Sequence, residues 1–197
     1  MGHIFYLMGK SSSGKDTIYK KLMEDPSLGL KNIVLYTTRP IRVGEEDGRE
    51  YFFVDEERLK ELQEAGKVIE LRSYDTCLGV WKYFTVSDEN IDLTQNNYLM
   101  IGTIESFVKT KEYYGKDTVI PLMIELSDGI RLRRALGRED KQENPKYSEM
   151  CRRFLADEQD FAPEKMVAAG IEKTYVNEHL DVCLSSLNAE IRKWISK

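Results

Sequence analysis

Residues 3–17, HIFYLMGKSSSGKDT, join a short apolar run to a cluster of glycine and serine. The run from His3 to Met8 is typical of a buried strand. The cluster from Gly9 to Gly14 is followed by Lys15 and by helical spacing as far as Met23. A Gly-x-x-x-x-Gly-Lys-Ser/Thr segment between a strand and a helix is the pattern of a phosphate-binding loop. The stretch therefore predicts a phosphate site close to the start of the chain.

The chemistry of this loop follows from its glycines and its lysine. Glycine lets the backbone curl so that consecutive N–H groups point at a phosphate, and the helix N-terminus adds favourable partial charge. We expect Lys15 to reach the outer phosphates. Asp16 stands where Ser or Thr is usual; its carboxylate could lie near Mg²⁺ but would repel phosphate, and Thr17 is the nearest hydroxyl. The expected ATP-binding residues are Gly9, Lys10, Ser11, Ser12, Ser13, Gly14, Lys15, Asp16 and Thr17, with Thr17 as the candidate metal ligand.

Beyond this loop, segments that suit strands alternate with segments that suit helices. We expect strands at 33–36, 51–54, 68–73, 83–86, 98–101, 118–126 and 173–177. We expect helices at 17–23, 56–65, 104–114, from 127 or 128 to 136, at 147–161 and from 180 onward. Asp55 can cap the second of these helices, and Gly66 can end it. The alternation predicts an α/β fold with a parallel sheet, into which a strand-rich segment is inserted.

The composition is that of a globular protein. Apolar residues make up 41% of the 197 residues and charged residues 32%, a mixture that suits a folded core and argues against disorder. The longest unbroken apolar run is Val119 to Ile124, whereas a membrane-spanning helix needs about 20 residues. The net charge of −5 argues against a general nucleic-acid binder. We therefore expect neither a membrane nor a nucleic acid as partner.

Cysteine and histidine are too few for an evident metal cage. The three cysteines lie far apart without a Cys-x-x-Cys pair, and there are two histidines. The N-terminus enters an apolar run without a basic stretch before it, so we expect no signal peptide. A cytoplasmic protein with reduced thiols follows from these features.

A second candidate anion site lies in residues 36–54, YTTRPIRVGEEDGREYFFV. Arg39 and Arg42 are three residues apart beside two glycines, and arginine binds phosphate through a planar fork of donors. Two arginines and the Tyr51 hydroxyl would suit a dianionic monophosphate. Taken alone, the stretch would equally suit a solvated charged turn.

The same stretch resembles the guanylate kinase signature, Thr-Thr-Arg-x-x-Arg-x-Gly-Glu-x-x-Gly-x-x-Tyr-x-Phe-Val, with the phosphate loop at the right distance upstream. The resemblance extends in weaker form over nearly the whole chain. It implies a P-loop core whose parallel sheet is flanked by helices, an inserted mixed α/β nucleoside-monophosphate-binding sub-domain and a lid. It also implies an enzyme of purine nucleotide metabolism that transfers the γ-phosphoryl group of ATP to GMP, giving ADP and GDP, with Mg²⁺ as cofactor.

The resemblance implies one guanylate-kinase-like domain over residues 1–197. Its core would comprise 1–32 and 87–197, the monophosphate-binding insertion about 33–86, and the lid about 137–146. The sequence gives no basis for an oligomeric state.

The resemblance also assigns the residues that would bind GMP. Arg39, Arg42, Tyr51 and Tyr83 match residues that hold its phosphate. Glu70 matches the acid that accepts from guanine N1–H and the exocyclic amine, and Thr85 matches a Ser or Thr that contacts the base. From the residues alone, Glu70 could also be an exposed strand acid and Tyr83 a core residue.

Arginines are also concentrated in the last third of the chain. Spacings of three and four residues place Arg131, Arg134 and Arg138 on one helix face if that helix continues to Gly137 or beyond. Arg152 and Arg153 follow on the next helix. The resemblance implies that Arg134, Arg138 and Arg153 contact the transferred phosphoryl group and that Asn177 lies near the ATP base. The expected catalytic residues are Lys15, Arg39, Arg134, Arg138 and Arg153. The alternative is a solvated helix whose arginines pair with Glu139 and Asp140.

Two further departures from the family pattern concern guanine. Leu35 stands where the family has a Ser that hydrogen-bonds the base, and Ile101-Gly-Thr103 aligns with its Asp-x-Asp. Glu105 or Asp75 could substitute for the missing acids. Two alternatives therefore stay open: a kinase with another purine monophosphate or a phosphorylated sugar as acceptor, and a non-catalytic guanylate-kinase-like binding module. Lys15 and the complete glycine loop weigh against the module.

Overall fold

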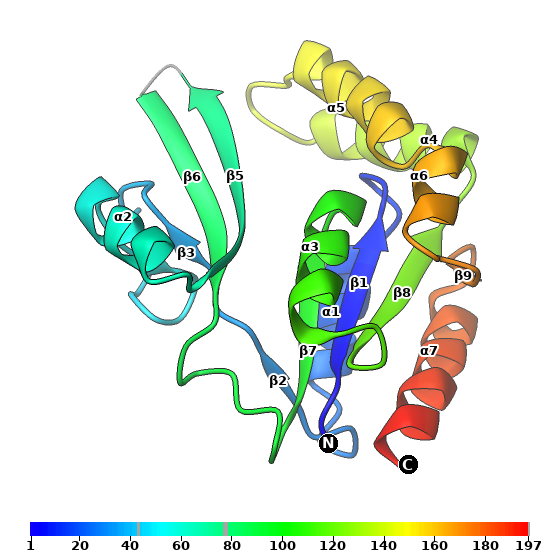
Figure 1. The fold of residues 1–197 in the computed structure, drawn as a ribbon. Coiled ribbons are helices and arrows are strands. Elements are labelled where there is room, and N and C mark those ends of the chain that lie inside the picture. The colour runs from blue at the N-terminus through cyan, green and yellow to red at the C-terminus, as the bar shows by residue number, and fades with distance from the viewer. Residues whose placement is uncertain (43, 77–78, 197) are drawn as a thin grey trace.

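A five-stranded parallel sheet forms the core of the computed structural model, which describes residues 1–42, 44–76 and 79–196 (Figure 1). Every residue of its central strand is buried, as expected for a strand covered on both faces. The strand order is β2-β7-β1-β8-β9, with β1 (Ile4–Gly9), β2 (Leu30–Asn32), β7 (Asn97–Gly102), β8 (Val119–Glu125) and β9 (Thr174–Val176). All four pairings are parallel, which confirms the predicted α/β class.

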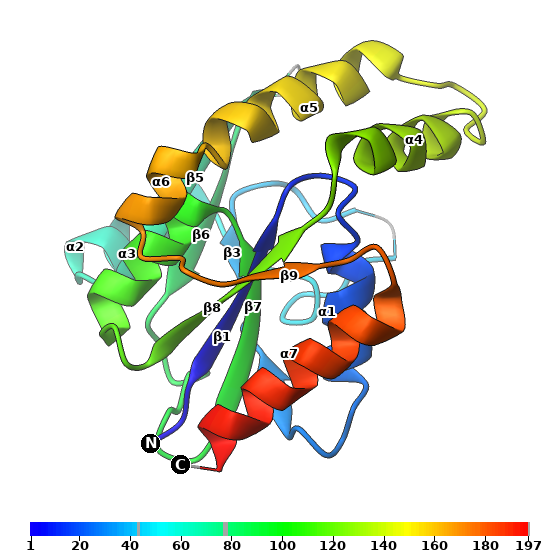
Figure 2. The same cartoon turned by 90° about the vertical axis from the view of Figure 1, so that its right-hand side faces the viewer.

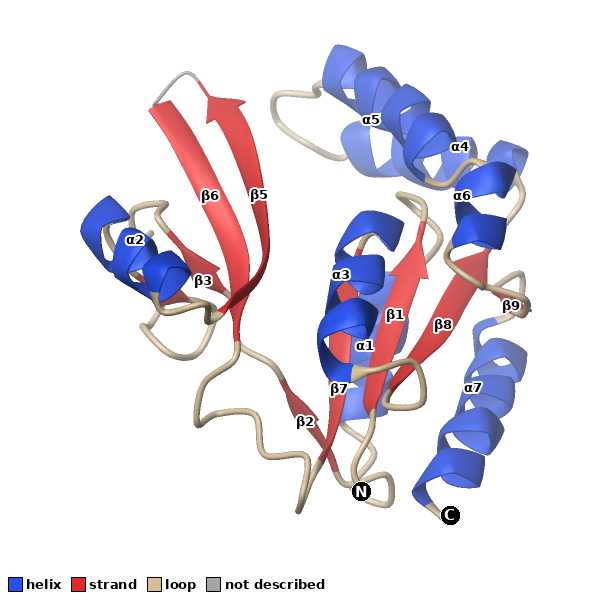
Figure 3. Ribbon diagram, viewed as in Figure 1, coloured by secondary structure: helices blue, strands red, loops and turns tan. Residues whose placement is uncertain are grey.

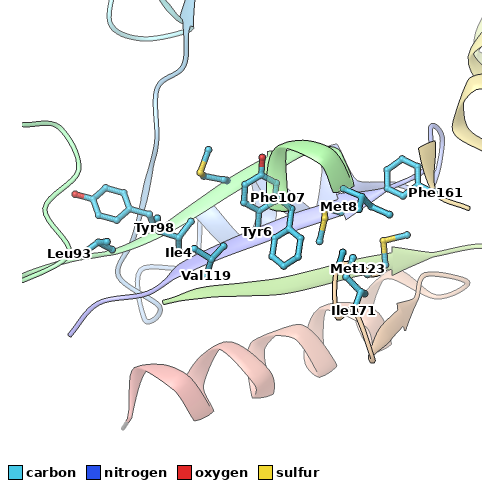
Figure 4. Close-up of a cluster of buried hydrophobic side chains, with 13 residues drawn as sticks. Ile4, Tyr6, Met8, Leu93, Tyr98, Phe107, Val119, Met123, Phe161 and Ile171 are labelled. Carbon is cyan, nitrogen blue, oxygen red and sulfur yellow. The ribbon is translucent and has the colours of Figure 1, made fainter. Parts of the chain in front are cut away.

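Alternate residues of β1 face two separate helical layers. Phe5 and Leu7 pack with α1 (Lys15–Met23) and α7 (Leu180–Ile195). Tyr6 faces the other layer and packs edge to face on Phe107 of α3 (Ile104–Tyr114), at 5.6 Å between ring centroids (Figure 4). α6 (Pro163–Ala168) continues that second layer (Figure 2). The period of two along a strand therefore builds both halves of the core.

A smaller mixed sheet stands beside the core (Figure 3). Its order is β4-β3-β6-β5, with β3 (Tyr36–Thr37), β4 (Phe52–Phe53), β5 (Val68–Thr76) and β6 (Gly79–Val86). α2 (Glu56–Glu64) covers one face and buries Leu59 and Leu62 against Phe84. The side chain of Asp55 accepts from the Arg58 amide at 2.8 Å, so the predicted N-cap is confirmed.

A pair of helices lies beyond the carboxyl ends of the core strands (Figure 2). α4 (Asp128–Glu139) and α5 (Tyr147–Asp160) run close together and are joined by the segment 140–146. α4 buries Arg131, and α5 buries no residue. Polar contacts therefore hold the two helices to the core more than hydrophobic packing does. Within the described residues, no helix is both long and apolar enough to cross a bilayer.

The structure corrects three details of the sequence analysis. The predicted strand 33–36 is wrong, because β2 ends at Asn32 in the core sheet and β3 starts at Tyr36 in the second sheet. Ile33 and Leu35 pack on the core cluster while Tyr36 packs on the other, so one apolar run serves two sheets. α4 continues to Glu139, so Gly137 lies inside a helix. The short α6 was not predicted.

We expect Phe84→Ala to lower the free energy of unfolding by about 3–5 kcal/mol, because the ring fills the small cluster under α2 and its removal leaves a cavity. Urea unfolding measures this change. The exposed Val167→Ala should stay within about 0.5 kcal/mol of the parent protein. Equal effects of the two variants would contradict the assignment of Phe84 as the centre of that cluster.

Candidate active site

The phosphate loop joins β1 to α1 by a backbone that turns twice into the left-handed region. Ser12 has φ 65° and Gly14 has φ 91°. A Cβ on Gly14 would lie 2.4 Å from Nδ2 of Asn177, so the position needs glycine for space as well as for conformation. Nδ2 of Asn177 donates to the Ser13 carbonyl at 2.7 Å. The side chain of Asn177, the residue directly after β9, therefore fixes the loop.

Lys15 opens into a cleft of about 570 Å³ beside the loop. Its Nζ is 3.8 Å from Oδ1 of Asp16, whose side chain is 80% exposed. Water screens such a contact, so Lys15 stays available to an anion. Predicted site residues that line this cleft with Lys15 are Ser12, Gly14, Asp16, Thr17, Arg134, Arg138 and Asn177.

Two predicted arginines of α4 bind the loop region directly. Nη2 of Arg138 donates to Oγ of Ser12 at 2.6 Å, and Nη2 of Arg134 donates to the Asn177 carbonyl at 3.3 Å. The alternative reading, in which these arginines pair with the next acids, does not hold here. Glu139 accepts from the Lys146 amide and Asp140 from the Tyr147 hydroxyl.

Asn177, which was expected to lie near an ATP base, lines the cleft and binds the loop itself. Its amide nitrogen is used on the loop backbone, as described above. Its Oδ1 and the Oγ of Ser13 are buried and have no hydrogen-bond partner among the described residues. Buried polar atoms normally find a partner. The two atoms therefore mark a place beside the loop that a polar ligand or a water molecule would complete.

Arg131 has a role that the sequence analysis missed. It is 1% exposed, and its guanidinium donates to Asp128 at 2.6 Å, to Asp157 at 2.8 Å and to Glu158 at 3.2 Å. Its Nε donates to the Ser11 carbonyl at 3.0 Å, and Asp157 accepts from the Ser11 amide at 2.8 Å. α4, α5 and the loop thus meet on one guanidinium. The sequence showed the charge of Arg131 but not its burial.

Further contacts extend this junction. The Arg131 guanidinium carbon lies 4.8 Å from the ring centroid of Phe154 on α5, within the range of a cation–π interaction. Nζ of Lys10 donates to Glu158 at 2.6 Å. Lys10 and Ser11 are therefore engaged with α5, whereas Ser12 and Lys15 line the cleft of about 570 Å³.

Arg153 is not brought to Lys15 in this structure. It is 65% exposed on α5, and its Nε donates to Glu149 at 2.8 Å. A hydrogen bond from Arg152, which has the larger effect, and one from Arg153 lower the pKa of Glu149 to about 2. Arg153 lines a second, smaller cleft together with Arg138. Arg138 therefore lies between the loop cleft and the exposed arginines of α5.

The pairing of β5 with β6 gathers polar side chains on the sheet face opposite α2. Leu71 and Phe84 point to α2, so their neighbours along the strands point the other way. The cross-strand pairs on this outer face are Glu70 with Thr85, Arg72 with Tyr83, and Tyr74 with Trp81. We call these six residues the acceptor face. α3 of the core packs next to β5 (Figure 1).

The predicted phosphate-binding residues meet at one end of the acceptor face. Arg39 is buried and donates to both carboxylate oxygens of Glu45, at 3.0 and 2.8 Å. Its guanidinium carbon lies 5.6 Å from the Tyr51 ring, and the Tyr51 and Tyr83 ring centroids are 5.5 Å apart. Arg42 lies 5.8 Å from the Trp81 ring. Tyr83 belongs to this cluster rather than to an apolar core.

Mutual hydrogen bonds affect the titration of the Arg39–Glu45 pair. The bond from Arg39 lowers the pKa of Glu45, and the bond to Glu45 raises the pKa of Arg39. Both groups therefore stay ionised near neutral pH as a salt-bridged pair.

Glu70 lies at the other end of the acceptor face. It is 3% exposed, so it is not an ordinary exposed strand acid. Oε1 accepts from Thr85 Oγ1 at 2.8 Å and from Arg72 Nη2 at 3.2 Å, and Oε2 accepts from Arg72 Nε at 3.0 Å. The structure thus brings together Glu70 and Thr85, both of which were predicted to contact guanine, and it places Arg72, which was not predicted, beside them.

The positions that depart from the family pattern have structural roles here. Leu35 packs on the core cluster. Thr103 caps α3, its Oγ1 accepting from the Ser106 amide at 3.3 Å. Glu105 is exposed and pairs with Lys109 at 3.3 Å. Asp75 lies near the far end of β5 and does not line the cleft between β5 and α3 that Thr103 and Glu105 line. Neither acid contacts Glu70.

A resident metal cluster is not part of the described structure. Within residues 1–42, 44–76 and 79–196, no three His, Cys, Asp or Glu side chains converge as metal ligands. Asp16 and Thr17 are the exposed oxygen donors in the first turn of α1, next to Lys15.

We expect Arg131→Met to lower the free energy of unfolding by about 3–5 kcal/mol, because it leaves Asp157 without its cation. Hydrogen exchange at the Ser11 amide should become faster, because Asp157 would no longer be held in place to accept from it. Arg192→Met, which removes an exposed arginine of α7, serves as the control. If exchange at Ser11 is unchanged in Arg131→Met, this arginine does not fix the loop.

Comparison with known proteins leads to the same family as the signature in residues 36–54. The guanylate kinase family model matches residues 2–91. A guanylate kinase of Rhodopseudomonas palustris strain HaA2 is 42% identical over 79 residues, which are 40% of this chain. That alignment spans 36% of the length of the relative.

Two other matches cover nearly the whole chain. The crystal structure of guanylate kinase from Anaplasma phagocytophilum has a TM-score of 0.65 and 20% identity, covering 98% of this chain and 85% of that one; it supports the fold alone. A guanylate kinase of Caldanaerobacter subterraneus subsp. tengcongensis is 32% identical, and the alignment covers 93% of this chain and 94% of the relative. On this match, together with the phosphate loop, the chain belongs to the guanylate kinase family of nucleoside monophosphate kinases.

Proposed function

We propose that this protein transfers the γ-phosphoryl group of ATP to GMP, giving ADP and GDP. The observation that carries the proposal is the presence of two separate cationic sites, one at the phosphate loop of the core and one on the second sheet. One comprises Lys15, Arg134 and Arg138 at the phosphate loop. The other is the cluster of Arg39, Arg42 and tyrosines on the acceptor face. A kinase that joins two phosphorylated substrates needs a site of this kind for each.

The donor site would act through charge and position. The loop N–H groups and the N-terminus of α1 favour the β- and γ-phosphates of ATP, and Lys15 would follow the transferred group. Arg134 and Arg138 would neutralise charge that develops during transfer. Arg153 would join them after leaving Glu149, a contact between exposed side chains that costs little to break.

The acceptor site would hold GMP along the acceptor face. Arg39, Arg42, Tyr51 and Tyr83 would bind its phosphate, while Glu70 and Thr85 would contact guanine. An oxygen of the GMP phosphate attacks the γ-phosphorus and forms the new P–O bond. The bond from that phosphorus to the β–γ bridging oxygen breaks, and ADP leaves with the electron pair.

Mg²⁺ is the cofactor that the family implies, and the donor set fits a weakly held ion. Mg²⁺ prefers oxygen ligands, keeps several waters and is bound through one or two protein groups plus substrate phosphates. Thr17 and Asp16 would supply those protein oxygens beside Lys15. When bound with ATP, the ion would neutralise part of the negative charge of the phosphates.

A kinase with a different acceptor is the second candidate. It is favoured by the end of the acceptor face that holds Glu70 and Thr85, where Glu70 already accepts three hydrogen bonds and has no room for both the N1–H and the 2-amino group of guanine. Leu35 cannot hydrogen-bond a base, and Thr103 is used as a helix cap. Another purine monophosphate or a phosphorylated sugar would then occupy the same site.

A coupled assay of ADP formation separates these functions. We expect the highest kcat/KM with GMP in a panel of GMP, IMP, AMP, CMP and ribose 5-phosphate. A higher value with another acceptor would favour the second candidate. Absence of ADP formation with every acceptor, in a protein that binds ATP, would instead indicate a non-catalytic module.

Lys15→Ala should reduce kcat by orders of magnitude without changing the fold, because the variant loses the charge that follows the phosphoryl group. Lys60→Ala on the exposed face of α2 is the matched control and should keep full activity. Circular dichroism and thermal unfolding check both proteins. Full activity of a folded Lys15→Ala protein would refute the assignment of this loop to the donor.

Arg39→Lys keeps the charge but loses the planar fork, so we expect kcat/KM for GMP to fall by about 10- to 100-fold. The KM for ATP should not change. Arg49→Lys, an exposed arginine of the same loop region, is the control. A change confined to the KM for ATP would mean that Arg39 does not belong to the acceptor site.

A further inference from the structure

We propose that Arg72 is a specificity-determining residue of the acceptor site and that it donates to O6 of a 6-oxopurine such as guanine while the remaining acceptor position of Glu70, on Oε2, takes N1–H. The inference rests on the proposed function and deepens it. It arises from a side chain that the family signature did not indicate.

Arg72 lies beside Glu70 on the acceptor face. The two residues are two positions apart on β5, so their side chains leave the strand on the same side. Arg72 is opposite Tyr83, which lies at the end of the acceptor face near Arg39 and Tyr51. Its side chain is 20% exposed and lines a cleft of about 780 Å³ between β5 and α3. Arg72 would therefore contact an acceptor that is bound between the two sheets.

Arg72 compensates the burial of Glu70. A buried carboxylate without a partner is costly, and Glu70 is buried. Arg72 offers two parallel N–H groups to it, at 3.0 and 3.2 Å, in the geometry that arginine and carboxylate favour. Burial disfavours the charged form of Arg72, but nearby groups, the Glu70 carboxylate foremost, outweigh this effect and the pKa of Arg72 is raised. The two side chains are therefore fixed side by side, with Arg72 on the wall of the cleft.

The hydrogen-bonding capacity that remains matches one edge of a purine. Guanidinium has five N–H groups, and two donate to Glu70; among the described residues no other acceptor takes one from Arg72. Oε1 of Glu70 already accepts twice, whereas Oε2 accepts once. The site thus offers donors next to an acceptor. Guanine presents the complement, the acceptor O6 next to the donor N1–H, whereas adenine presents an amino group at position 6.

The other side chains that the family pattern places near the base offer O6 less than Arg72 does. Among the described residues, Thr85 donates its hydroxyl proton to Glu70, and Leu35 packs on the core cluster without a polar group. Thr103 has a single hydroxyl, which caps α3. We therefore expect discrimination between guanine and adenine at position 6 to depend on the charged donors of Arg72.

The test compares Arg72→Met with the wild type in the full-length protein. The acceptors are GMP, IMP, AMP and 2-aminopurine riboside 5′-monophosphate, which has the 2-amino group but lacks O6. We expect kcat/KM for GMP and IMP to fall together by about 10- to 100-fold, because both lose a charged hydrogen bond. The value for the 2-aminopurine nucleotide, or its Ki as a competitive inhibitor, should not change. The preference for GMP over AMP should shrink by the same factor.

Two further variants keep the outcome interpretable. Arg72→Lys retains a cation for Glu70 but not the fork, so it protects the fold while it still lowers kcat/KM for GMP. Arg58→Met removes an exposed arginine of α2 and should change nothing. Thermal unfolding verifies that each variant is folded.

Three results would overturn the inference. In the first, all four nucleotides lose the same factor, which would mean that Arg72 merely supports the fold of the site. In the second, the GMP to AMP ratio of the folded variants equals that of the wild type. In the third, the 2-aminopurine nucleotide loses as much as GMP. Failure of the wild type to phosphorylate any of the nucleotides would be different, because it would refute the proposed function itself.

Discussion

The buried guanidinium of Arg131 is the interaction on which the donor half of the molecule depends. It binds acids from α4 and α5 and the backbone of the phosphate loop. α4 buries no other residue and α5 buries none, so little apolar area fixes these helices. Because an unpaired buried charge is costly, this junction holds the helices in one orientation. Arg134 and Arg138 face the loop cleft as a consequence of that orientation.

A second constraint comes from the path of the chain between its two sheets. The chain leaves the core after β2, builds the second sheet and re-enters the core at β7. The acceptor face is carried by the second sheet and the phosphate loop by the first (Figure 1). Phosphoryl transfer requires the reacting atoms to come within about 3–3.5 Å of each other. For the proposed reaction we therefore expect the two sheets to approach one another when both substrates are bound.

The sequence predicted the features that local signals encode. The glycine loop between strand and helix, the Asp55 cap and the limits of α3 depend on neighbouring residues, and the structure has them. The strand 33–36 was wrong because local apolarity does not tell which sheet a residue joins. The burial of Arg131 depends on its contacts with α5, for example with Asp157, which is 26 residues further along the chain. The pair of Glu70 and Arg72 did have a signal, since opposite charges two apart on a strand share a face.

Closure of the two sheets on a ligand that occupies both sites tests the central claim most directly. The ligand is adenosine and guanosine joined through a pentaphosphate, and the measurement is small-angle X-ray scattering of the free and saturated protein. The account predicts a smaller radius of gyration in the complex than in the free protein or with ATP alone. Identical scattering curves, with saturation verified by calorimetry, would contradict it.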